Sequence, residues 1–362
     1  MDRRAIALEI ARELGFDLAG IAALEPPPDA ARFEAWLAAG HGAGMDWLER
    51  QSERIRDPRR ILPGGMSLLV VGVGHSRAAV ELAGGGRVAR YAAGRDYHNW
   101  IGKRLKKLAR RLEEAGLAGP WRGITDAGPL LERSHAAAAG LGFLSKAANL
   151  LHPRFGPWFF LGELILGEEL EPTEGPAAGS CGTCTACLDV CPTDAIREPG
   201  LVHAPDCISY LTIEHRGAIP AALREPIGDW VFGCDLCSEV CPFGRKAPDL
   251  AERFGTHRQV AEGDLVSWLA PRREMSVDFE GSALRRPNRE GLARNAAIVL
   301  GNRPRDEGRH ALLRVLTEDP SPVVREAAAW GLERGHAADA GVAQALDAAR
   351  KRGDWLPMSD RN

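Results

Sequence analysis

The sequence predicts a protein in three parts: the first mixes α-helices with β-strands, the second is rich in cysteine, and the third is all helical. Their expected extents are residues 1–170, 171–250 and 251–362. Helical and strand patterns alternate in the first part, every cysteine falls in the second, and two similar helical segments recur in the third. With 362 residues, 45% hydrophobic and 26% charged, the chain can bury a core without disulfides, which excludes disordered and collagen-like proteins.

Apolar spacing locates the elements of the first part. The uncharged run from Ser67 to Val73 follows Pro63-Gly64-Gly65, which indicates a buried strand that begins after a turn. The Pro/Gly-rich stretch 172–179 is expected to link this part to the cysteines. The expected helices cover residues 6–14, 31–39 and 100–115, and the expected strands cover residues 67–73, 121–124 and 158–166.

No part of the sequence has the pattern of a membrane span or an export signal. The longest apolar runs, such as Trp158 to Leu161, are far too short to cross a bilayer. Met1-Asp2-Arg3-Arg4 leads directly into a helical pattern without a signal-peptide core. We therefore expect a cytoplasmic protein that does not bind membranes.

All eight cysteines lie between positions 181 and 241. Residues 181–192 read C-x2-C-x2-C-x3-C-P, which is the bacterial iron–sulfur run, and residues 234–242 read C-x2-C-x3-C-P with Cys207 upstream. Four disulfides would suit a small secreted domain and not a chain of this length. Zinc is the remaining alternative for C-x-x-C pairs, but the complete spacing favours two [4Fe-4S] clusters in a ferredoxin-like module.

In two-cluster ferredoxins the last cysteine of each run binds the other cluster. The ligands of each expected cluster therefore come from both runs. One set is Cys181, Cys184, Cys187 and Cys241, and the other is Cys191, Cys207, Cys234 and Cys237.

The tail contains an internal repeat. Residues 292–301 resemble residues 323–332, at a distance of 31 positions, and helical patterns lie between and after them. Stacked helical hairpins of a HEAT-like kind are expected. Between Arg285 and Arg314 there are eight arginines and only three acidic residues. This excess fits either contact with nucleic-acid phosphates or a surface that keeps the repeat soluble. The candidate contacts to such phosphates are Arg285, Arg286, Arg289 and Arg294.

Asp126 lies where an expected strand gives way to a helix that Pro129 would open. An aspartate at such a junction either caps the helix or projects a catalytic carboxyl from the sheet edge. Partial burial against a large cofactor would raise its pKa and let it donate a proton. Asp96-Tyr97-His98 is one residue out of register with a cobalt-binding histidine motif, so we expect His98 to begin a helix capped by Asp96 and not to bind metal.

The whole chain, as far as about Leu332, resembles the epoxyqueuosine reductases. These are cobalamin- and iron–sulfur-dependent enzymes of the last step in making the tRNA base queuosine. The cysteine pattern alone is shared with many ferredoxins, and its combination with the Asp126 segment and the basic tail is much more specific. The resemblance rests on residues 95–98, 126–133, 140–146, 155–164 and 207–214 together with the cysteine pattern.

The resemblance implies an N-terminal domain that holds cob(II)alamin over the ferredoxin-like module without a protein ligand to cobalt. Asp126 matches the proton donor of the family, and Arg216 falls near a tRNA contact. Contacts to cobalamin are implied for Arg54, Ala89, Asp126, Leu150, Leu161, Ser209, Cys234 and Asp235.

Two other classes fit part of the pattern. A plain two-cluster electron carrier has no use for 170 upstream residues or for the arginine-rich tail. A cobalamin-dependent reductive dehalogenase would share the corrin and two clusters, but it is typically exported with a twin-arginine leader, and Arg3-Arg4 lacks the apolar core that follows one. We therefore expect a monomeric enzyme that reduces epoxyqueuosine to queuosine at the wobble position of tRNA, using an external low-potential electron donor.

Overall fold

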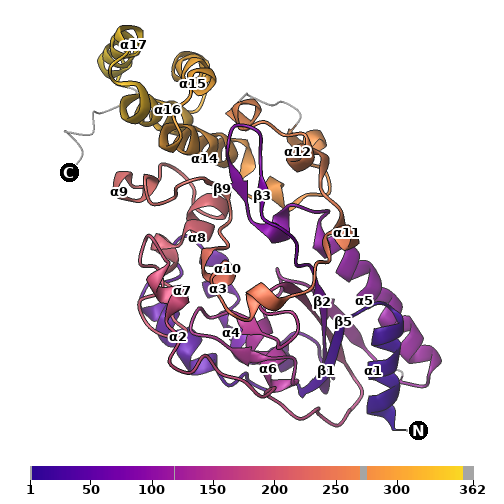
Figure 1. Ribbon diagram of the computed structural model, residues 1–362. Helices are drawn as coiled ribbons and strands as arrows, with labels where there is room; N and C mark the ends of the chain where they lie inside the picture. The colour runs from indigo at the N-terminus through magenta and orange to yellow at the C-terminus, as the bar shows by residue number, and fades with distance from the viewer. Residues whose placement is uncertain (1, 118, 270–274, 354–362) are drawn as a thin grey trace.

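The computed structural model describes residues 2–117, 119–269 and 275–353. Its N-terminal part is built on an antiparallel sheet with the strand order β1-β2-β8-β5 (Figure 1). The central strand β2 is buried along its whole length, as its uncharged sequence predicts. The strands are β1 (Leu18–Ala23), β2 (Ser67–Gly74), β5 (Trp121–Ile124) and β8 (Phe159–Leu166).

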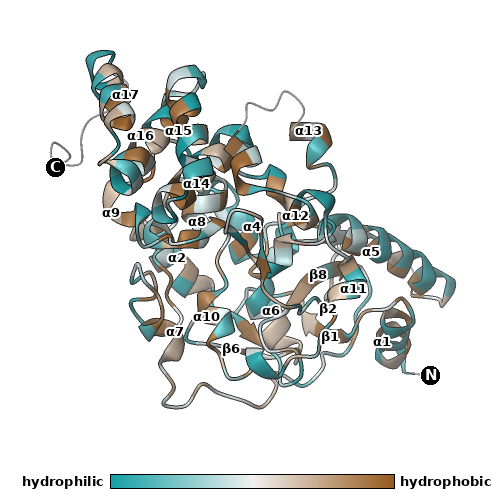
Figure 2. Ribbon diagram, turned by 45° about the horizontal axis from the view of Figure 1, so that its top comes forward, coloured by the Kyte–Doolittle hydropathy of each residue, from teal (hydrophilic) through white to brown (hydrophobic). Residues whose placement is uncertain are grey.

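Helices cover both faces of this sheet. α1 (Arg3–Glu13) and α5 (Tyr97–Glu114) pack on one face, where Ile101, Leu105 and Leu108 meet the side chains of β2 and β8. The outer side of α5 is hydrophilic, as Figure 2 shows. α6 (Glu132–Ala138) covers the other face and shares a second apolar cluster with β2 and β8.

Smaller elements surround the sheet and connect it to the cysteine-rich part. β4 pairs in parallel with β9, so a segment of the N-terminal part and a segment of the cysteine-rich part share one small sheet. These elements are α2 (Ala30–Ala38), α3 (Asp46–Arg50), α4 (Ser52–Arg56), β3 (Val80–Glu81), β4 (Arg87–Val88), β6 (Phe143–Leu144), β7 (Leu150–Leu151) and β9 (Trp230–Phe232).

The cysteine-rich part consists of loops and short helices. α7 (Ala186–Asp189) and α10 (Leu236–Glu239) each lie within a cysteine run and pack against each other, which brings the two runs together. α8 (Ile208–Ile213) begins directly after Cys207, and α9 (Ala221–Arg224) leads toward β9.

The tail is helical, and its helices α14 to α17 lie at the end of the molecule away from the N-terminus (Figure 1). α14 and α16 contain the two similar segments and pack closely: a Cβ on Gly301 would stand 2.5 Å from the Cα of Gly331. Glycine at both positions therefore allows the two helices to approach each other this closely. The tail helices are α11 (Ala251–Phe254), α12 (Arg258–Ala261), α13 (Met275–Asp278), α14 (Asn288–Asn302), α15 (Asp306–Glu318), α16 (Pro322–His336) and α17 (Ala340–Lys351).

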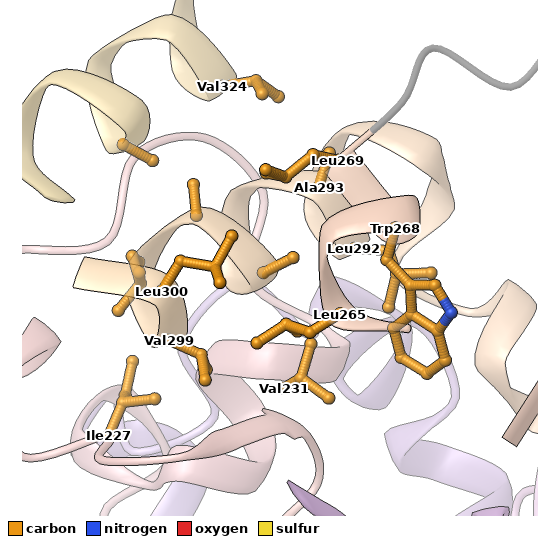
Figure 3. Close-up of a cluster of buried hydrophobic side chains, with 14 of the residues drawn as sticks. Ile227, Val231, Leu265, Trp268, Leu269, Leu292, Ala293, Val299, Leu300 and Val324 are labelled. Carbon is orange, nitrogen blue, oxygen red and sulfur yellow. The ribbon is translucent and has the colours of Figure 1, made fainter. Parts of the chain in front are cut away.

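One apolar core joins the tail to the cysteine-rich part. Leu292, Val299 and Leu300 of α14 and Val231 of β9 belong to this core (Figure 3). The expected boundary at residue 250 therefore falls between segments that share a core, and the three-part division stays a prediction. Residues 270–274 and 354–362 of the expected third part lie outside the described residues.

Candidate active site

Asp126 lies on a turn between β5 and α6. Its φ of +55° is in the left-handed region, and its backbone N–H donates to Oε1 of Glu132 at 2.7 Å. α6 begins at Glu132, so the expectation that Pro129 opens this helix is wrong. The position before α6 is Leu131, without a side-chain cap, so Asp126 does not serve as the cap. The capping alternative for Asp126 thus does not hold, and its carboxylate projects from the edge of the sheet.

Two side chains from the first turn of α5 bind the Asp126 carboxylate. Its Oδ2 accepts a hydrogen bond from the hydroxyl of Tyr97 at 2.9 Å and lies 3.0 Å from Nε2 of His98. At the other edge of the imidazole ring, Nδ1 of His98 lies 2.7 Å from Oδ1 of Asp96, which also caps α5 as the sequence predicts. Asp96, His98 and Asp126 therefore form a continuous hydrogen-bonded chain.

The hydrogen bonds among Asp96, His98 and Asp126 determine the direction in which the pKa of Asp126 and that of His98 are shifted. Burial raises the pKa of Asp126, but the hydrogen bonds from His98 and Tyr97 outweigh it, so the pKa is lowered overall. The expectation of a raised pKa concerned Asp126 buried against a large cofactor, whereas in the protein alone the two donors, which sequence spacing does not reveal, set the direction. Burial lowers the pKa of His98, but the hydrogen bonds to Asp126 and Asp96 outweigh it and raise the pKa to about 9.

A column of stacked aromatic rings packs against the hydrogen-bonded residues. The ring of Tyr97 stacks on His98 with centroids 4.1 Å apart and on Phe160 of β8 at 3.9 Å, and Phe160 stacks on the buried His75 at 4.1 Å. Stacked rings resist rotation, so this column fixes the side chains that reach Asp126.

Two glutamates missed by the sequence analysis also surround Asp126. Burial and the charge of Asp126 raise the pKa of Glu132 to about 7. Glu163 is fully buried at the centre of β8, opposite Ile124, and neither carboxylate oxygen has a hydrogen-bond partner in the described part of the chain. Burial raises its pKa well above the usual range, since an ionised carboxylate there would lack solvation. The sequence contains a signal for this residue, because Glu163 is the only charged residue in the apolar strand β8.

The cysteines form two neighbourhoods that combine both runs. The burial that raises the pKa of Cys187 is reinforced by the charges of nearby cysteines from the first run and of Cys241 from the second. Cys184 is exposed, whereas the other cysteines are partly buried. A cavity of about 170 Å³ gives room for a bound cluster, and the cysteines that line it are Cys181, Cys184, Cys187, Cys237 and Cys241. The cysteine neighbours of Cys187 are Cys181, Cys184 and Cys241, that of Cys207 is Cys191, and those of Cys234 are Cys207 and Cys237. Cys237 also lies near Cys187, so the two groups adjoin each other.

The residues expected to contact cobalamin gather only in part. Ala89 packs so closely on Gly233 that a Cβ on this glycine would stand 2.5 Å from the Cβ of Ala89. The neighbouring backbone N–H of Arg90 donates to Oδ2 of the buried Asp235 at 2.7 Å, next to Cys234. These contacts bring the segments 89–90 and 233–235 together. Leu150 is buried in β7, Leu161 lies on β8, Ser209 lies on α8, and Arg54 is exposed on α4.

The candidate tRNA arginines fall into different surroundings. Arg285 and Arg286 are exposed, Arg286 pairs with Glu214 at 2.8 Å, and Arg216 donates to the carbonyl of Arg286 at 2.9 Å. Arg289 forms an ion pair with the buried Asp319, so part of its charge is already compensated.

Arg294 is not available for a phosphate. It is only 1% exposed, and its guanidinium donates to the carbonyls of Leu211, His215 and Gly217. Its assignment as a tRNA contact is therefore wrong, because the side chain points into the core that joins α14 to α8.

A short loop lies between the Asp126 site and the cysteines. Arg133, whose charge acts on Asp126, donates to the carbonyl of Ala148 at 2.7 Å, and Nδ2 of the next residue, Asn149, lies 4.0 Å from Sγ of Cys237. An aspartate–histidine pair beside two cysteine runs of iron–sulfur spacing is the arrangement expected of an iron–sulfur oxidoreductase. Among the described residues there is no helix long and apolar enough to cross a membrane.

Comparisons with known proteins agree with this class and identify the family. Residues 180–244 match the family model described as 4Fe-4S double cluster binding domain, which decides against zinc, and residues 56–127 match Epoxyqueuosine reductase QueG, DUF1730. The epoxyqueuosine reductase of Xanthomonas campestris is 41% identical over 340 residues, covering 89% of this chain and 93% of that protein. The chain belongs to the epoxyqueuosine reductase family.

Solved structures of this family have the same fold. An epoxyqueuosine reductase crystallised with an epoxyqueuosine-modified tRNA stem loop is 27% identical and superposes with a TM-score of 0.84, covering 96% of this chain and 93% of that one. A Bacillus subtilis epoxyqueuosine reductase, solved with its catalytic aspartate loop swung out of the active site, gives the same identity, coverage and TM-score.

Proposed function

We propose that this enzyme reduces epoxyqueuosine to queuosine at the wobble position of tRNA. The observation that carries the proposal is the site itself: Asp126 is held by Tyr97 and His98 at the sheet edge, and the loop residues Ala148 and Asn149 lie between Arg133, beside it, and Cys237. A reduction that removes an epoxide oxygen needs electrons and protons at one place, and this site offers both.

The cysteines are proposed to hold two [4Fe-4S] clusters, with the crossed ligand sets expected from their spacing. Support comes from the mixed neighbourhoods of Cys187 and Cys234 and from the cavity within the first group. An external low-potential electron donor is proposed to approach near the exposed Cys184. When bound, the clusters supply single electrons, and cobalamin supplies a reducible cobalt.

The residues present fit a corrin between the sheet and the cysteine-rich part. Gly233 leaves no space for a larger side chain against Ala89 beside Cys234, and we propose that this close packing keeps side chains out of the space that the cofactor would occupy. Leu150 and Leu161 supply apolar surface, and Asp126 remains 57% exposed on the side where a substrate would lie. Arg54, Ser209 and Asp235 are proposed as further contacts on the strength of the family resemblance.

Asp126 is proposed to protonate the departing epoxide oxygen. Its position on a turn, and not within a helix, permits the loop motion seen in the Bacillus subtilis relative. The hydrogen bond from its N–H to Glu132 would hold the inward position, since the left-handed backbone of a non-glycine residue needs support.

The tail is proposed to hold the tRNA. Wobble bases lie in a single-stranded loop that can be splayed into a pocket while arginines bind the phosphates. Arg285 and Arg286 are exposed, and the charge of Asp126 acts on Arg286, so this edge of the tail borders the site. We propose that α14 to α17 form a HEAT-like unit and that Arg216 and Arg289 act from its margin.

The test is to express the chain in a strain that lacks this step and to analyse its tRNA nucleosides. We expect epoxyqueuosine to disappear and queuosine to appear, and the Asp126→Asn variant should leave epoxyqueuosine in place. Persistence of epoxyqueuosine with the wild-type chain, when the purified protein contains both iron and corrin, would contradict the proposal.

A further inference from the structure

We propose that His98 stores the proton that Asp126 passes to the substrate, so that solvent, His98 and Asp126 form a proton relay to the departing oxygen. The inference rests on the proposed function and adds to it the source of the proton. It gives His98 a role in proton transfer, whereas its position in the sequence indicates only the start of a helix.

The imidazole ring is held on both edges. Oδ1 of Asp96 accepts a hydrogen bond from the backbone N–H of His98 at 2.9 Å and lies 2.7 Å from its Nδ1. The opposite ring nitrogen, Nε2, lies 3.0 Å from Oδ2 of Asp126. Since one carboxylate faces each nitrogen, a doubly protonated ring donates in both directions and needs no rotation to transfer its proton to Asp126.

The ring is also fixed in orientation and open to water. It stacks on Tyr97, whose own hydroxyl donates to the same Oδ2 of Asp126, and Tyr97 stacks in turn on Phe160. The side chain is 37% exposed, so water can return a proton after each transfer. A residue that only started the helix would not need this packing.

The charges around the ring decide where the proton resides at neutral pH. The two carboxylates raise the pKa of His98 to about 9, and the donors to Asp126 lower the pKa of that carboxyl. The ring is therefore protonated, and Asp126 ionised, throughout the neutral range. The other charged or titratable groups that interact with Asp126 are Glu132, Glu163, Arg133, Tyr91, Tyr97 and Arg286.

The transfer balances with the overall reaction. An epoxide, two electrons and two protons give an alkene and water, as both C–O bonds of the epoxide break. In each proton transfer the Nε2–H bond of His98 breaks as an Oδ2–H bond forms on Asp126, and this bond breaks as the substrate oxygen gains its O–H bond. His98 regains its proton from water, and the electrons come from the external one-electron donor through the clusters.

The relay predicts the direction of the pH dependence. A group with a raised pKa keeps its proton below that pKa and loses it as the pH rises, so turnover should stay level through neutral pH and fall as the pH passes about 9. If Asp126 stored the proton itself, turnover would already decline as the pH rises through its lowered pKa, in the acid range.

The experiment compares the pH profile of single-turnover reduction of epoxyqueuosine in tRNA for the holoenzyme and two variants. His98→Gln keeps an amide donor for Asp126 but has no proton to transfer, and we expect turnover at pH 7 to fall about 10²-fold and the alkaline decline to vanish. Asp96→Asn keeps a good helix cap and removes one negative charge from the ring, so its alkaline decline should move to lower pH.

Controls separate this inference from the proposed function. Iron content, the corrin spectrum and tRNA affinity of both variants should equal those of the wild type. Absence of turnover in the wild type at every pH would overturn the proposed function, on which the relay depends. Wild-type turnover with a His98→Gln rate within about threefold and an unchanged profile would overturn the relay alone.

Discussion

Replacing Arg294 by methionine should destabilise the protein without weakening its contact with tRNA. The guanidinium donates to the carbonyls of Leu211, at 2.7 Å, His215, at 3.0 Å, and Gly217, at 2.7 Å. Methionine fills much of the space but donates no hydrogen bond. Each buried acceptor left without a donor costs about 1–3 kcal/mol. Since neighbouring losses are not additive, we expect a total of about 3–5 kcal/mol.

Thermal unfolding followed by circular dichroism measures this loss. For a chain of this size each kcal/mol corresponds to about 2 °C, so the apparent Tm should fall by about 6–10 °C. Binding of an anticodon stem-loop, measured well below the Tm, should keep its affinity and salt dependence. Arg285→Met is the matched control: this side chain is exposed, so its stability should change by less than about 0.5 kcal/mol.

The two variants should therefore have opposite effects. If Arg285 binds a phosphate, its replacement weakens binding and reduces the slope of log affinity against log salt by about 0.7–0.9. An Arg294→Met protein with an unchanged Tm and a reduced salt slope would refute the structural role that the hydrogen bonds assign to Arg294.

Three further outcomes are expected. Anaerobic reconstitution should yield about eight iron atoms per chain, as two cubane clusters require, and replacing Cys207 by serine should remove one cluster's share, whereas tightly bound zinc would contradict the cluster assignment. Asp126→Asn should keep iron and corrin but slow turnover about 10²–10⁴-fold, and a change below threefold in nucleoside analysis would indicate that the carboxyl transfers no proton. His98→Ala should leave the electron paramagnetic resonance of cob(II)alamin unchanged, because His98 faces two carboxylates; loss of a nitrogen coupling in the variant would contradict this.

Local patterns predicted the frame of the N-terminal part well. The strand β2, the helix α5 and the cap at Asp96 lie where apolar spacing and capping chemistry indicate. The start of α6 was predicted three residues early, at Pro129, because Glu132 instead binds the backbone of Asp126 and the turn is completed before the helix begins. A side chain that reaches back to a turn leaves no periodic signal.

Local patterns could not predict the hydrogen-bonded residues of the active site because these residues are far apart in the sequence. Asp126 meets Tyr97 and His98 only after β5 has paired with β8 and α5 has packed across the sheet. The resemblance to a family identified Asp126, but the spacing of residues could not reveal which donors bind it. In the protein alone the direction of its pKa follows from those donors, which no local pattern reveals.

Charge density alone could not separate the arginines of the tail into contact and core residues. An exposed helix shows its inner face by a period of 3.6, but α14 is buried continuously from Gly291 to Gly301 because α16, β9 and α8 pack around it. In a helix that is covered on all sides, no face is reserved for solvent. Arg294 can enter the core because the carbonyls of Leu211 in α8 and of His215 and Gly217 in the loop that follows accept hydrogen bonds from its guanidinium, while Arg285, just before the helix, remains at the surface. The same residue type thus joins two parts of the fold at one position and is exposed at the other, and only the packing of α14 decides which.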